Sequence, residues 1–554
     1  MSPRVSNRRI RLLLLGTTLA FACLLGRAVW LQGVQAASLE RLGESQNTVT
    51  VALPAGRGAI LDRQGVPLAM GTQAETVYAD PMRVRNPWTT AVAAARALDL
   101  NSDAVDKSIS DRKTRFVYIE RQADPEKAAK LQKLQLPGLG FYPEEKRVYP
   151  QHDIGSHVVG YAGVDNVGLA GLERQYDKVL AGRSGTQTIV RDPTGRAVST
   201  VKSVAPREGR NVHLAIDRIM QENLQNVLGD TVAQWRAKGA TGIVLDPRNG
   251  GIMAMAVSPG FDADHFSSTS PDVTRLRAVT DTYEPGSTFK IVSVSAALSE
   301  GLVTPSNSFT LPPEIKVADR TIHEADRKVT EQMSVAQIVA KSSNVGAVTL
   351  AELVNQKRFY HWIRRFGFGQ KTGVDFPGES QGILLPEPKW SGSSIGNLAI
   401  GQGVGVTALQ MASAYGAIAN AGMWIQPHFV TKVGAQRPFR PNKRRILSPH
   451  IANEMVSMLK DVVSVGGTGD NARVPGYQVA GKTGTAQKPD AHGYSRSKYV
   501  SSFVGFVPAT APRLVILVSV DEPHGQIYGG IVAAPAFARI ARYDMQYLGV
   551  PPDA

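Results

Sequence analysis

Ser287 and Lys290 are the residues whose types and spacing most directly suggest chemistry. They lie in Tyr-Glu-Pro-Gly-Ser-Thr-Phe-Lys (residues 283–290), ahead of an apolar run at 291–298. The Pro-Gly turn predicts that a helix begins at the serine, where unpaired N–H groups favour negative charge on its oxygen. A lysine three residues on shares that face, and when held away from water it can take the serine's proton. The pair therefore predicts a nucleophile and its base.

Two further patterns strengthen this prediction, because Ser-x-x-Lys alone is common and recurs four more times in the chain. Ser-Ser-Asn at 342–344 lies in a break between two helical patterns, 335–340 and 346–354. Lys-Thr-Gly-Thr at 482–485 follows a strand-like stretch at 477–480. The elements around all three patterns must bring them to one cleft.

Residues 476–483 also match the P-loop pattern of nucleotide-binding proteins. A P-loop needs a strand before the loop and a helix after its lysine. Here a strand-like segment occupies the loop, and Gly484 and Pro489 follow Lys482. We therefore expect a strand that carries lysine and hydroxyl groups along a cleft, and no nucleotide.

Composition narrows the class of protein. The 554 residues include 62 Lys and Arg against 47 Asp and Glu, a net charge of +15, which suits an anionic membrane or an acidic polymer. No helix-turn-helix, zinc-finger or aromatic RNA-binding pattern favours nucleic acid. Cys23 is the only cysteine and the histidines are scattered, with His152 and His157 interpreted as surface residues. We expect no metal site and no cofactor.

The N-terminus predicts a membrane anchor. A basic tail at 1–11 precedes an uncharged run, with Arg27 able to snorkel and Trp30 at an interface, so residues 12–31 can form a single span. Positive charge inside places the rest of the chain outside the cytoplasm. The alternative is a cleaved signal peptide, because 34–36 is an acceptable cleavage tripeptide.

The remaining patterns predict an α+β protein. Strand–turn–strand is expected at 57–69, and strand-like runs at both ends of the later region, with helices between, predict an antiparallel sheet packed with helices. The first region shows no catalytic cluster, and a composition change near 206–210 marks a boundary. The expected parts are a basic tail (1–11), an anchor (12–31), an elongated β-rich pedestal (32–210), a catalytic domain (211–548) and a short tail (549–554).

The three patterns, in this order, match the set found in penicillin-binding proteins and serine β-lactamases. Further stretches resemble class B penicillin-binding proteins, so the resemblance covers nearly the whole chain. Glu284 and Phe289 look more like the division-specific FtsI type (penicillin-binding protein 3) than the elongation-specific type. The stretches are Arg57–Ala69, Gly160–Glu173, Gly401–Gly403 and Tyr528–Gly530.

The resemblance implies a peptidoglycan D,D-transpeptidase that β-lactams inhibit. Ser287 would attack the carbonyl between the last two D-alanines of a stem peptide, and an amine of a neighbouring stem would resolve the acyl-enzyme. The implied roles are Lys290 as base, Ser342 and Asn344 as proton relay and peptide holder, Lys482, Thr483, Gly484 and Thr485 as substrate-binding strand, and the backbone N–H groups of Ser287 and Thr485 as oxyanion hole.

Several alternatives stay open. An elongation- or sporulation-specific class B enzyme, a D,D-carboxypeptidase, or an acylated sensor or scaffold would share these motifs. A β-lactamase is disfavoured, because no glutamate motif for deacylation is found. No glycosyltransferase module is found either, so the resemblance implies an FtsW-like membrane partner and other division proteins.

Overall fold

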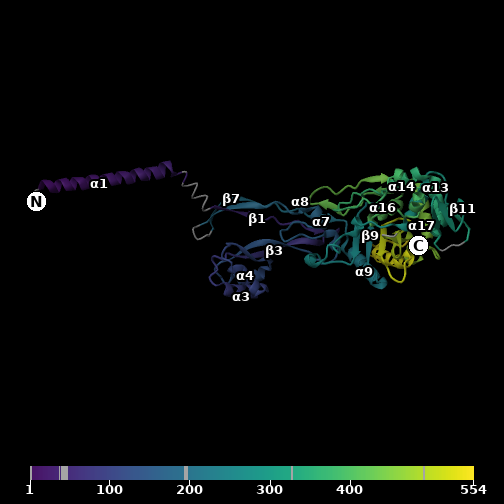
Figure 1. The fold of residues 1–554 in the computed structure, drawn as a ribbon, viewed down its shortest axis with the longest axis horizontal. Coiled ribbons are helices and arrows are strands. Elements are labelled where there is room, and N and C mark those ends of the chain that lie inside the picture. Colours follow the sequence, from purple (N-terminus) through teal and green to yellow (C-terminus); the bar gives the residue numbers. More distant parts are fainter. Residues whose placement is uncertain (1–2, 37, 39–47, 192–196, 326–328, 491–492) are drawn as a thin grey trace. The chain divides into compact units, whose positions relative to one another are not determined.

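The computed structural model describes residues 3–36, 38, 48–191, 197–325, 329–490 and 493–554 (Figure 1). It consists of two compact units, Met1–Gly56 with Gly182–Glu208, and Arg57–Ala181 with Gly209–Ala554. The fold is α+β, as predicted. The domain boundaries expected from the sequence remain predictions.

The first unit contains the apolar N-terminal helix. Helix α1 (Pro3–Val29) continues into one π-helical turn, η1 (Trp30–Val34). Together they supply a stretch, Asn7–Val34, that is long and apolar enough to cross a membrane. The unit also holds an antiparallel sheet in the order β1-β6-β7, with β1 at Thr48–Leu53, β6 at Gly185–Arg191 and β7 at Ala197–Val204.

The second unit begins with the predicted strand–turn–strand. Asp62 Oδ1 accepts hydrogen bonds from the backbone N–H groups of Gln64 and Val66, both at 2.8 Å, and Gly65 takes a φ of +87°. This turn joins β2 to β3 in a six-stranded sheet, in which β5 pairs with β3. Its strands are β16 (Val430–Val433), β8 (Val212–Leu214), β2 (Ile60–Leu61), β3 (Pro67–Ala79), β4 (Val117–Ala123) and β5 (Leu139–Val148).

A small, separate hydrophobic core packs against β3 and β4 of this sheet. It joins residues of β3 and β4 to three helices, each of which starts at an Asn or Asp whose side chain accepts a backbone N–H group. The helices are α3 (Pro87–Leu98), α4 (Ser102–Ser110) and α5 (Pro125–Gln132).

Three short helices follow β5, namely α6 (Ser156–Val159), α7 (Gly171–Gln175) and α8 (Asp177–Leu180). A buried ion network connects β5 to α7, and Arg57 extends it to α8. Glu173 is fully buried and accepts from Arg57 Nε at 2.8 Å and from Arg147 Nε at 2.6 Å. Arg57 also donates to Asp177 at 2.8 Å. Two guanidinium groups thus depend on one buried carboxylate.

The later region is built on a five-stranded antiparallel sheet in the order β10-β9-β20-β19-β18. Helix α9 begins after the capping residue Asp217, whose Oδ1 accepts the N–H group of Ile219 at 3.0 Å. The strands are β9 (Gly239–Leu245), β10 (Ile252–Ser258), β18 (Ala480–Asp490), β19 (Gly493–Val507) and β20 (Leu514–Asp521).

Helices cover both faces of this sheet. Gly242 and Leu245 of β9 are three positions apart and so face opposite sides. A Cβ at Gly242 would lie 2.6 Å from Leu224 of α9, whereas one at Gly416 of α16 would lie 3.4 Å from Leu245. Helix α19 packs beside α9, with Phe537 against Phe503 of β19. The helices are α9 (Arg218–Trp235), α16 (Ala408–Ala419) and α19 (Ala534–Tyr547).

Shorter elements complete the unit. The helical ones are η2 (Ala263–Ser268), α10 (Arg277–Thr280), η3 (Gly286–Phe289), α11 (Lys290–Ser299), α12 (Val335–Ala340), α13 (Asn344–Val354), α14 (Gln356–Phe366), η4 (Glu387–Lys389), α15 (Ser394–Ala399), α17 (Pro449–Asp461), η5 (Asp470–Ala472) and α18 (Gly529–Val532). The strands are β11 (Ser308–Leu311), β12 (Glu314–Val317), β13 (Arg320–His323), β14 (Glu331–Ser334), β15 (Met423–Ile425) and β17 (Lys443–Arg445).

Two expectations from the sequence were wrong. The strand near Lys482 does not occupy 477–480 but begins at Ala480, so Lys482 lies within β18. His157 is not a surface residue. It is buried, with Nε2 2.8 Å from the carbonyl oxygen of Val273, and burial lowers its pKa to about 4. His152 is exposed, as expected.

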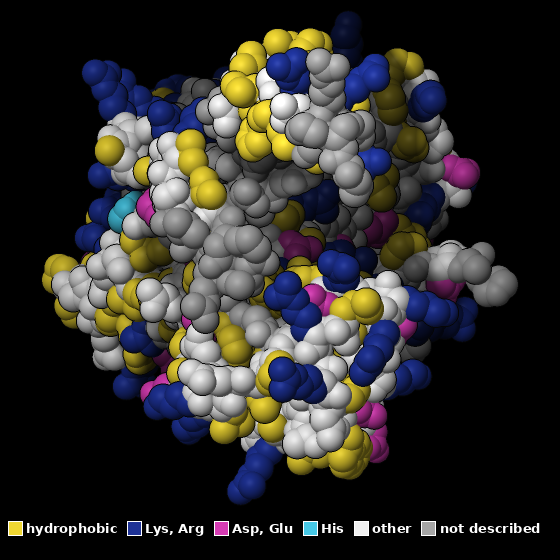
Figure 2. Space-filling view, turned by 90° about the vertical axis from the view of Figure 1, so that its left-hand side faces the viewer, with side chains coloured by type: hydrophobic (Ala, Val, Ile, Leu, Met, Phe, Trp, Pro, Cys, Tyr) yellow, Lys and Arg dark blue, Asp and Glu magenta, His cyan; other side chains and the backbone are white. Residues whose placement is uncertain are grey.

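The surface reflects the composition. Figure 2 shows Lys and Arg side chains spread over the face drawn, with few acidic side chains between them. This agrees with the net charge of +15.

We predict that Glu173→Ala strongly destabilises the protein. The substitution leaves Arg57 and Arg147 buried without their shared carboxylate, at a cost of about 3–5 kcal/mol. Denaturant unfolding measures the loss. As a control, Lys127→Ala removes an exposed ion pair with Asp99 from within helix α5 and should leave the unfolding midpoint unchanged. Equal midpoints for the two variants would contradict the prediction.

Candidate active site

Ser287 lies on a tight turn held by buried neighbours. The turn is the 3₁₀ segment η3, which leads directly into α11, so the serine stands at a helix start as predicted. Gly286 takes a φ of +56° and donates to the carbonyl oxygen of Gly401 at 3.1 Å. Buried Tyr415 of α16 donates to the carbonyl oxygen of Thr288 at 3.0 Å. Ser287 itself stays half-buried.

Lys290 is 3 % exposed, and its Nζ has three acceptors. It donates to the carbonyl oxygen of Ser342 at 2.6 Å, to Asn344 Oδ1 at 2.7 Å and to Ser342 Oγ at 3.3 Å. Burial lowers the pKa of Lys290 to about 7, although the negative charge of Glu324 acts in the opposite direction. A substantial share of this lysine is therefore neutral near pH 7.

The Ser342–Asn344 segment joins α12 to α13. Ser342 adopts a φ of +58°, which is strained for a residue with a side chain. Ser343 is buried and caps α13 by accepting the N–H group of Gly346 at 2.9 Å. Asn344 Nδ2 donates to the carbonyl oxygen of His323 at 2.9 Å. The segment thus presents a backbone carbonyl oxygen, a hydroxyl and a side-chain amide oxygen to Lys290.

A second lysine reaches the same hydroxyl from β18. Lys482 is 1 % exposed, and its Nζ donates to Ser342 Oγ at 2.8 Å. Burial, with the nearby charge of Lys290, lowers the pKa of Lys482 well below its usual range. Ser342 Oγ therefore bridges the two lysines.

The rest of the β18 motif lies beside the serine turn. A Cβ at Gly484 would lie 2.9 Å from the carbonyl oxygen of Pro285, so glycine is required for this approach. Thr485 is half-buried, and its Oγ1 accepts from the N–H group of Gly529 at 3.1 Å. Thr483 Oγ1 lies 3.3 Å from Thr468 Oγ1.

The structure thus brings Lys290, Ser342, Asn344 and Lys482 into one hydrogen-bond network, from segments far apart in the sequence. Among the described residues, no hydrogen bond joins Ser287 Oγ to Lys290. Such contacts are often long without substrate and shorten in the reacting complex. The arrangement can activate a half-exposed hydroxyl with a buried, partly neutral amine.

Sequence reasoning missed residues that hold this network. Glu324 accepts from the backbone of Asn344 and Val345, and Tyr415 holds the turn. Neither carries a spacing signal. Glu284, by contrast, belongs to the motif at 283–290. Its Oε1 accepts from the N–H group of Gly403 at 2.9 Å and from the hydroxyl of Tyr494 at 3.0 Å.

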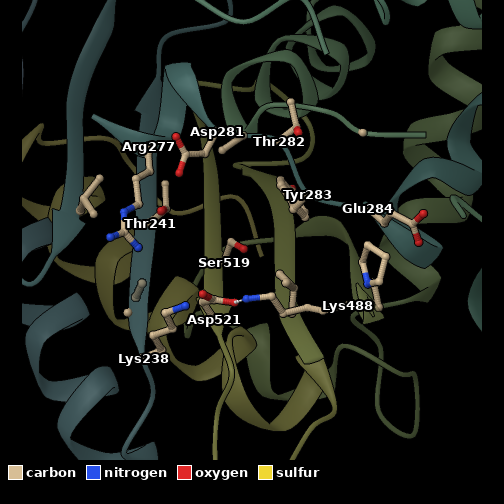
Figure 3. Close-up of a pocket in the computed structure, with 18 of the residues that line it drawn as sticks. Lys238, Thr241, Arg277, Asp281, Thr282, Tyr283, Glu284, Lys488, Ser519 and Asp521 are labelled. Atoms are coloured by element: carbon tan, nitrogen blue, oxygen red, sulfur yellow. Dashed lines mark hydrogen bonds and ion pairs between the residues drawn. The ribbon is translucent and has the colours of Figure 1, made fainter. Parts of the chain in front are cut away.

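A cavity of about 620 Å³ lies next to this site (Figure 3). Tyr283 and Glu284, just before the serine turn, line it together with the far end of β18. Lys488 and Asp521 form an ion pair of 2.8 Å within it. Neither Ser287 nor the two motif lysines line the cavity.

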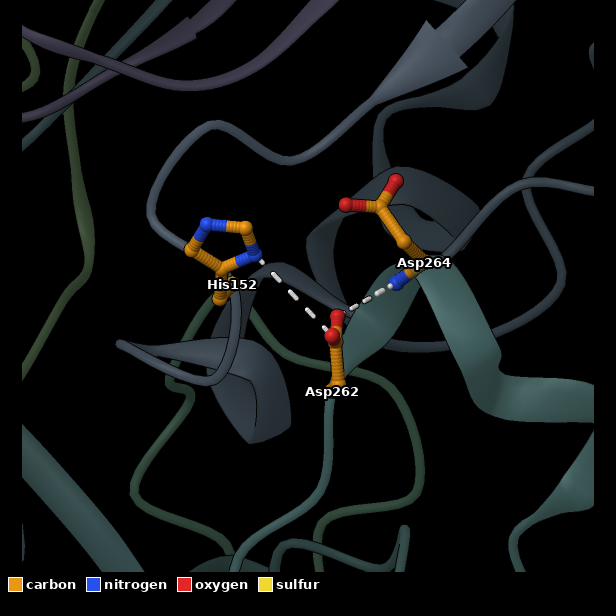
Figure 4. Close-up of side chains that lie close together, drawn as sticks. All are labelled: His152, Asp262 and Asp264. Atoms are coloured by element: carbon orange, nitrogen blue, oxygen red, sulfur yellow. Dashed lines mark hydrogen bonds and ion pairs between the residues drawn. The ribbon is translucent and has the colours of Figure 1, made fainter.

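A small polar cluster is formed by His152, Asp262 and Asp264 (Figure 4). Atoms of His152, Asp262 and Asp264 that could bind a metal ion lie within 4.8 Å of one another, and His152 and Asp264 are exposed. Asp262 caps η2 by accepting the N–H group of Asp264 at 2.9 Å. We assign no metal ion to this cluster, because exposed acidic groups are common without one and Asp262 already caps η2 and contacts His265.

The chain matches two protein-family models and is similar to characterised relatives and solved structures along most of its length. A family model described as "Penicillin binding protein transpeptidase domain" matches residues 240–542, and one described as "Penicillin-binding Protein dimerisation domain" matches residues 52–214. The peptidoglycan D,D-transpeptidase FtsI of Escherichia coli is 32% identical over 97% of this chain and 91% of its own length. Stage V sporulation protein D of Bacillus subtilis is 34% identical over 99% and 88%. The structure of penicillin-binding protein 3 of Mycobacterium tuberculosis complexed with aztreonam is 31% identical, with a TM-score of 0.73, covering 91% of this chain and 98% of that one.

We predict that Gly484→Ala slows covalent labelling by a fluorescent penicillin about tenfold or more. The new Cβ would meet Ser502 Oγ and the carbonyl oxygen of Pro285, and the backbone atom can move only with the serine turn. A tenfold loss corresponds to about 1.4 kcal/mol in the barrier. Gly260→Ala is the matched control, because its Cβ meets nothing within 4 Å. Unchanged labelling in a folded Gly484→Ala would contradict the proposed fit.

Proposed function

The chain belongs to the class B penicillin-binding proteins, and we propose that Ser287 is the nucleophile with which it acts as a peptidoglycan D,D-transpeptidase. The observation that carries this proposal is the convergence of Lys290, Ser342, Asn344 and Lys482 in one network beside the Ser287 turn. Both amines donate to the Ser342 hydroxyl, and Ser287 stands at the start of the helical segment that carries Lys290. Ser343 also lies at a helix start, but it is buried and its hydroxyl caps α13.

In the first step, neutral Lys290 takes the proton of Ser287 Oγ as the oxygen attacks the carbonyl between the last two D-alanines. The C–N bond then breaks, and the proton returns through Ser342 to the leaving D-alanine. The lowered pKa supports this role, because a lysine with a pKa near 7 is neutral roughly a thousand times more often at pH 7 than an ordinary lysine.

Substrate binding is proposed for β18. Lys482 and the threonine hydroxyls would hold the terminal carboxylate, and the N–H groups of Ser287 and Thr485 would stabilise the oxyanion, typically by about 3–4 kcal/mol for each donor. An amine of a neighbouring stem then attacks the ester and loses a proton to Lys290, and Lys290 returns that proton to Ser287 Oγ as the ester C–O bond breaks. Ser287 is released and the two stems are cross-linked.

A role in septal wall synthesis is the first candidate for the cellular function. The FtsI-type motif with Glu284 and the similarity to E. coli FtsI support it. The similarity to the sporulation protein D is of the same size and supports a sporulation-specific role as the second candidate. An FtsW-like glycosyltransferase and other division proteins are the partners proposed for the first role.

We further propose that the N-terminal helix stays in the protein as a single-pass anchor of the inner membrane. Its basic end would face the cytoplasm, because positive residues remain on that side, and both later regions would lie outside. The mature protein should therefore keep its N-terminus and sediment with membranes after a carbonate wash. N-terminal sequencing that begins near Ala37 would contradict the anchor.

We predict that Ser287→Ala abolishes penicillin labelling in a folded protein and that Lys290→Ala slows it by about 10²–10⁴. In the wild type, protonated Lys290 cannot act as a base. The labelling rate should therefore rise with pH and reach half its maximum near pH 7, the pKa of Lys290. Labelling that survives Ser287→Ala or moves to Ser342 would refute the assignment.

The cellular role is tested by depletion. Loss of a septal enzyme should leave cells elongating without closing septa, so that filaments form. Round or swollen cells would indicate an elongation enzyme. Normal vegetative shape with failed spores would indicate the sporulation role. Ser287→Ala in place of depletion should give the same phenotype if the chemistry is responsible.

A further inference from the structure

Glu324 is an acidic residue outside the three motifs that contacts the Ser342–Asn344 segment. It lies directly after β13 and accepts the hydroxyl of Ser343. Its carboxylate also accepts the N–H groups of Asn344 at 2.9 Å and Val345 at 3.1 Å. All three donors belong to the start of α13.

These contacts have a clear physical reason. The first N–H groups of a helix lack partners within the helix, and a carboxylate there is stabilised by hydrogen bonds and by the helix dipole. The hydroxyl of Ser343 accepts the next N–H group of the helix, that of Gly346. Glu324 therefore fixes the start of α13 from a separate hairpin.

Fixing this helix start also fixes the network. Asn344, the first residue of α13, contacts Lys290 through Oδ1 and His323 through its amide nitrogen. Ser342 lies two residues before it, in its strained conformation, between Lys290 and Lys482. A shift of the helix start would move all three acceptors of Lys290, which belong to Ser342 and Asn344.

We propose that Glu324 is a positioning residue for acyl transfer, which holds the Ser342–Asn344 segment against both lysines and places its carboxylate beside the residue whose side chain accepts from Lys290. This inference rests on the proposed roles of Ser287 and Lys290. It assigns Glu324 no contact with substrate.

Few charged side chains influence the protonation of Lys290. Within the described part of the chain, two charged groups face Lys290, which are Glu324 from the β13 side and Lys482 from β18. The α12–α13 segment contributes only the uncharged Ser342 and Asn344. His323, beside Glu324, is paired with Glu314 at 2.9 Å. Removing the charge of Glu324 should therefore ease the loss of a proton from Lys290.

The test is the pH profile of acylation of the full-length protein by a fluorescent penicillin. Glu324→Gln should lower the maximal rate at least fivefold, because an amide cannot accept all three donors. It should also move the half-maximal pH down by about one unit, the effect of losing a nearby opposite charge. A cap with a structural role alone would lower the rate at every pH and leave the half-maximal pH unchanged, and that result would overturn the proposal.

Two variants make the test specific. Glu324→Asp keeps the charge but shortens its reach, so the maximal rate should fall while the half-maximal pH stays near the wild-type value. Glu314→Gln removes an exposed charge from the same hairpin and should change neither quantity. If Glu324→Gln does not fold, Glu324→Asp decides, because a wild-type maximal rate in that variant would overturn the proposal. A wild-type profile without an inflection near pH 7 would instead refute Lys290 as the base.

Discussion

The structure of this site depends on keeping two lysine amines out of water around one serine hydroxyl. Burying an amine is tolerable only when its donors have acceptors, and each ammonium has three donors. Lys290 finds them in the carbonyl oxygen and hydroxyl of Ser342 and in Asn344. Lys482 uses the same hydroxyl and its neighbour Thr483. The cap of α13 by Ser343 and the contacts of Glu324 with Asn344 and Val345 keep the acceptors of Lys290 in place.

Close packing of small residues provides that rigidity. Gly286 and Gly401 approach so closely that a Cβ at Gly401 would lie 2.2 Å from the carbonyl oxygen of Gly286. Gly484 allows β18 to lie against the same turn. Helix α16 is buried along its whole length, and the hydroxyl of its Tyr415 donates to the carbonyl oxygen of Thr288 in the serine turn. Because cores of this density do not deform gradually, the distance between the turn and the strand is set by backbone contacts.

Much of this could be predicted from the sequence, because the motifs lie at local signals. A Pro-Gly turn before an apolar run located Ser287, and a break between two helical patterns located Ser342 and Asn344. The start of β18 was misplaced because the apolar stretch at 477–480 looks like a strand, whereas the pairing with β19 begins at Ala480. Glu324 and the buried position of His157 could not be predicted, since both depend on contacts between segments distant in sequence. The expected domain boundaries and residue roles remain predictions.

In the proposed mechanism, the charge of the bound donor peptide and the activation of Ser287 are coupled through the two buried lysines. Two ammonium groups this close, both buried, disfavour each other's charge, so burial and mutual repulsion together lower the pKa of Lys482. A terminal carboxylate bound at β18 would supply the missing negative charge and stabilise Lys482 as an ammonium. A charged Lys482 then disfavours a proton on Lys290, which leaves Lys290 neutral and able to act as a base. The donor's own carboxylate would therefore prepare the base that its acyl transfer requires, and a ligand without a negative charge at that position would bind beside a less reactive serine.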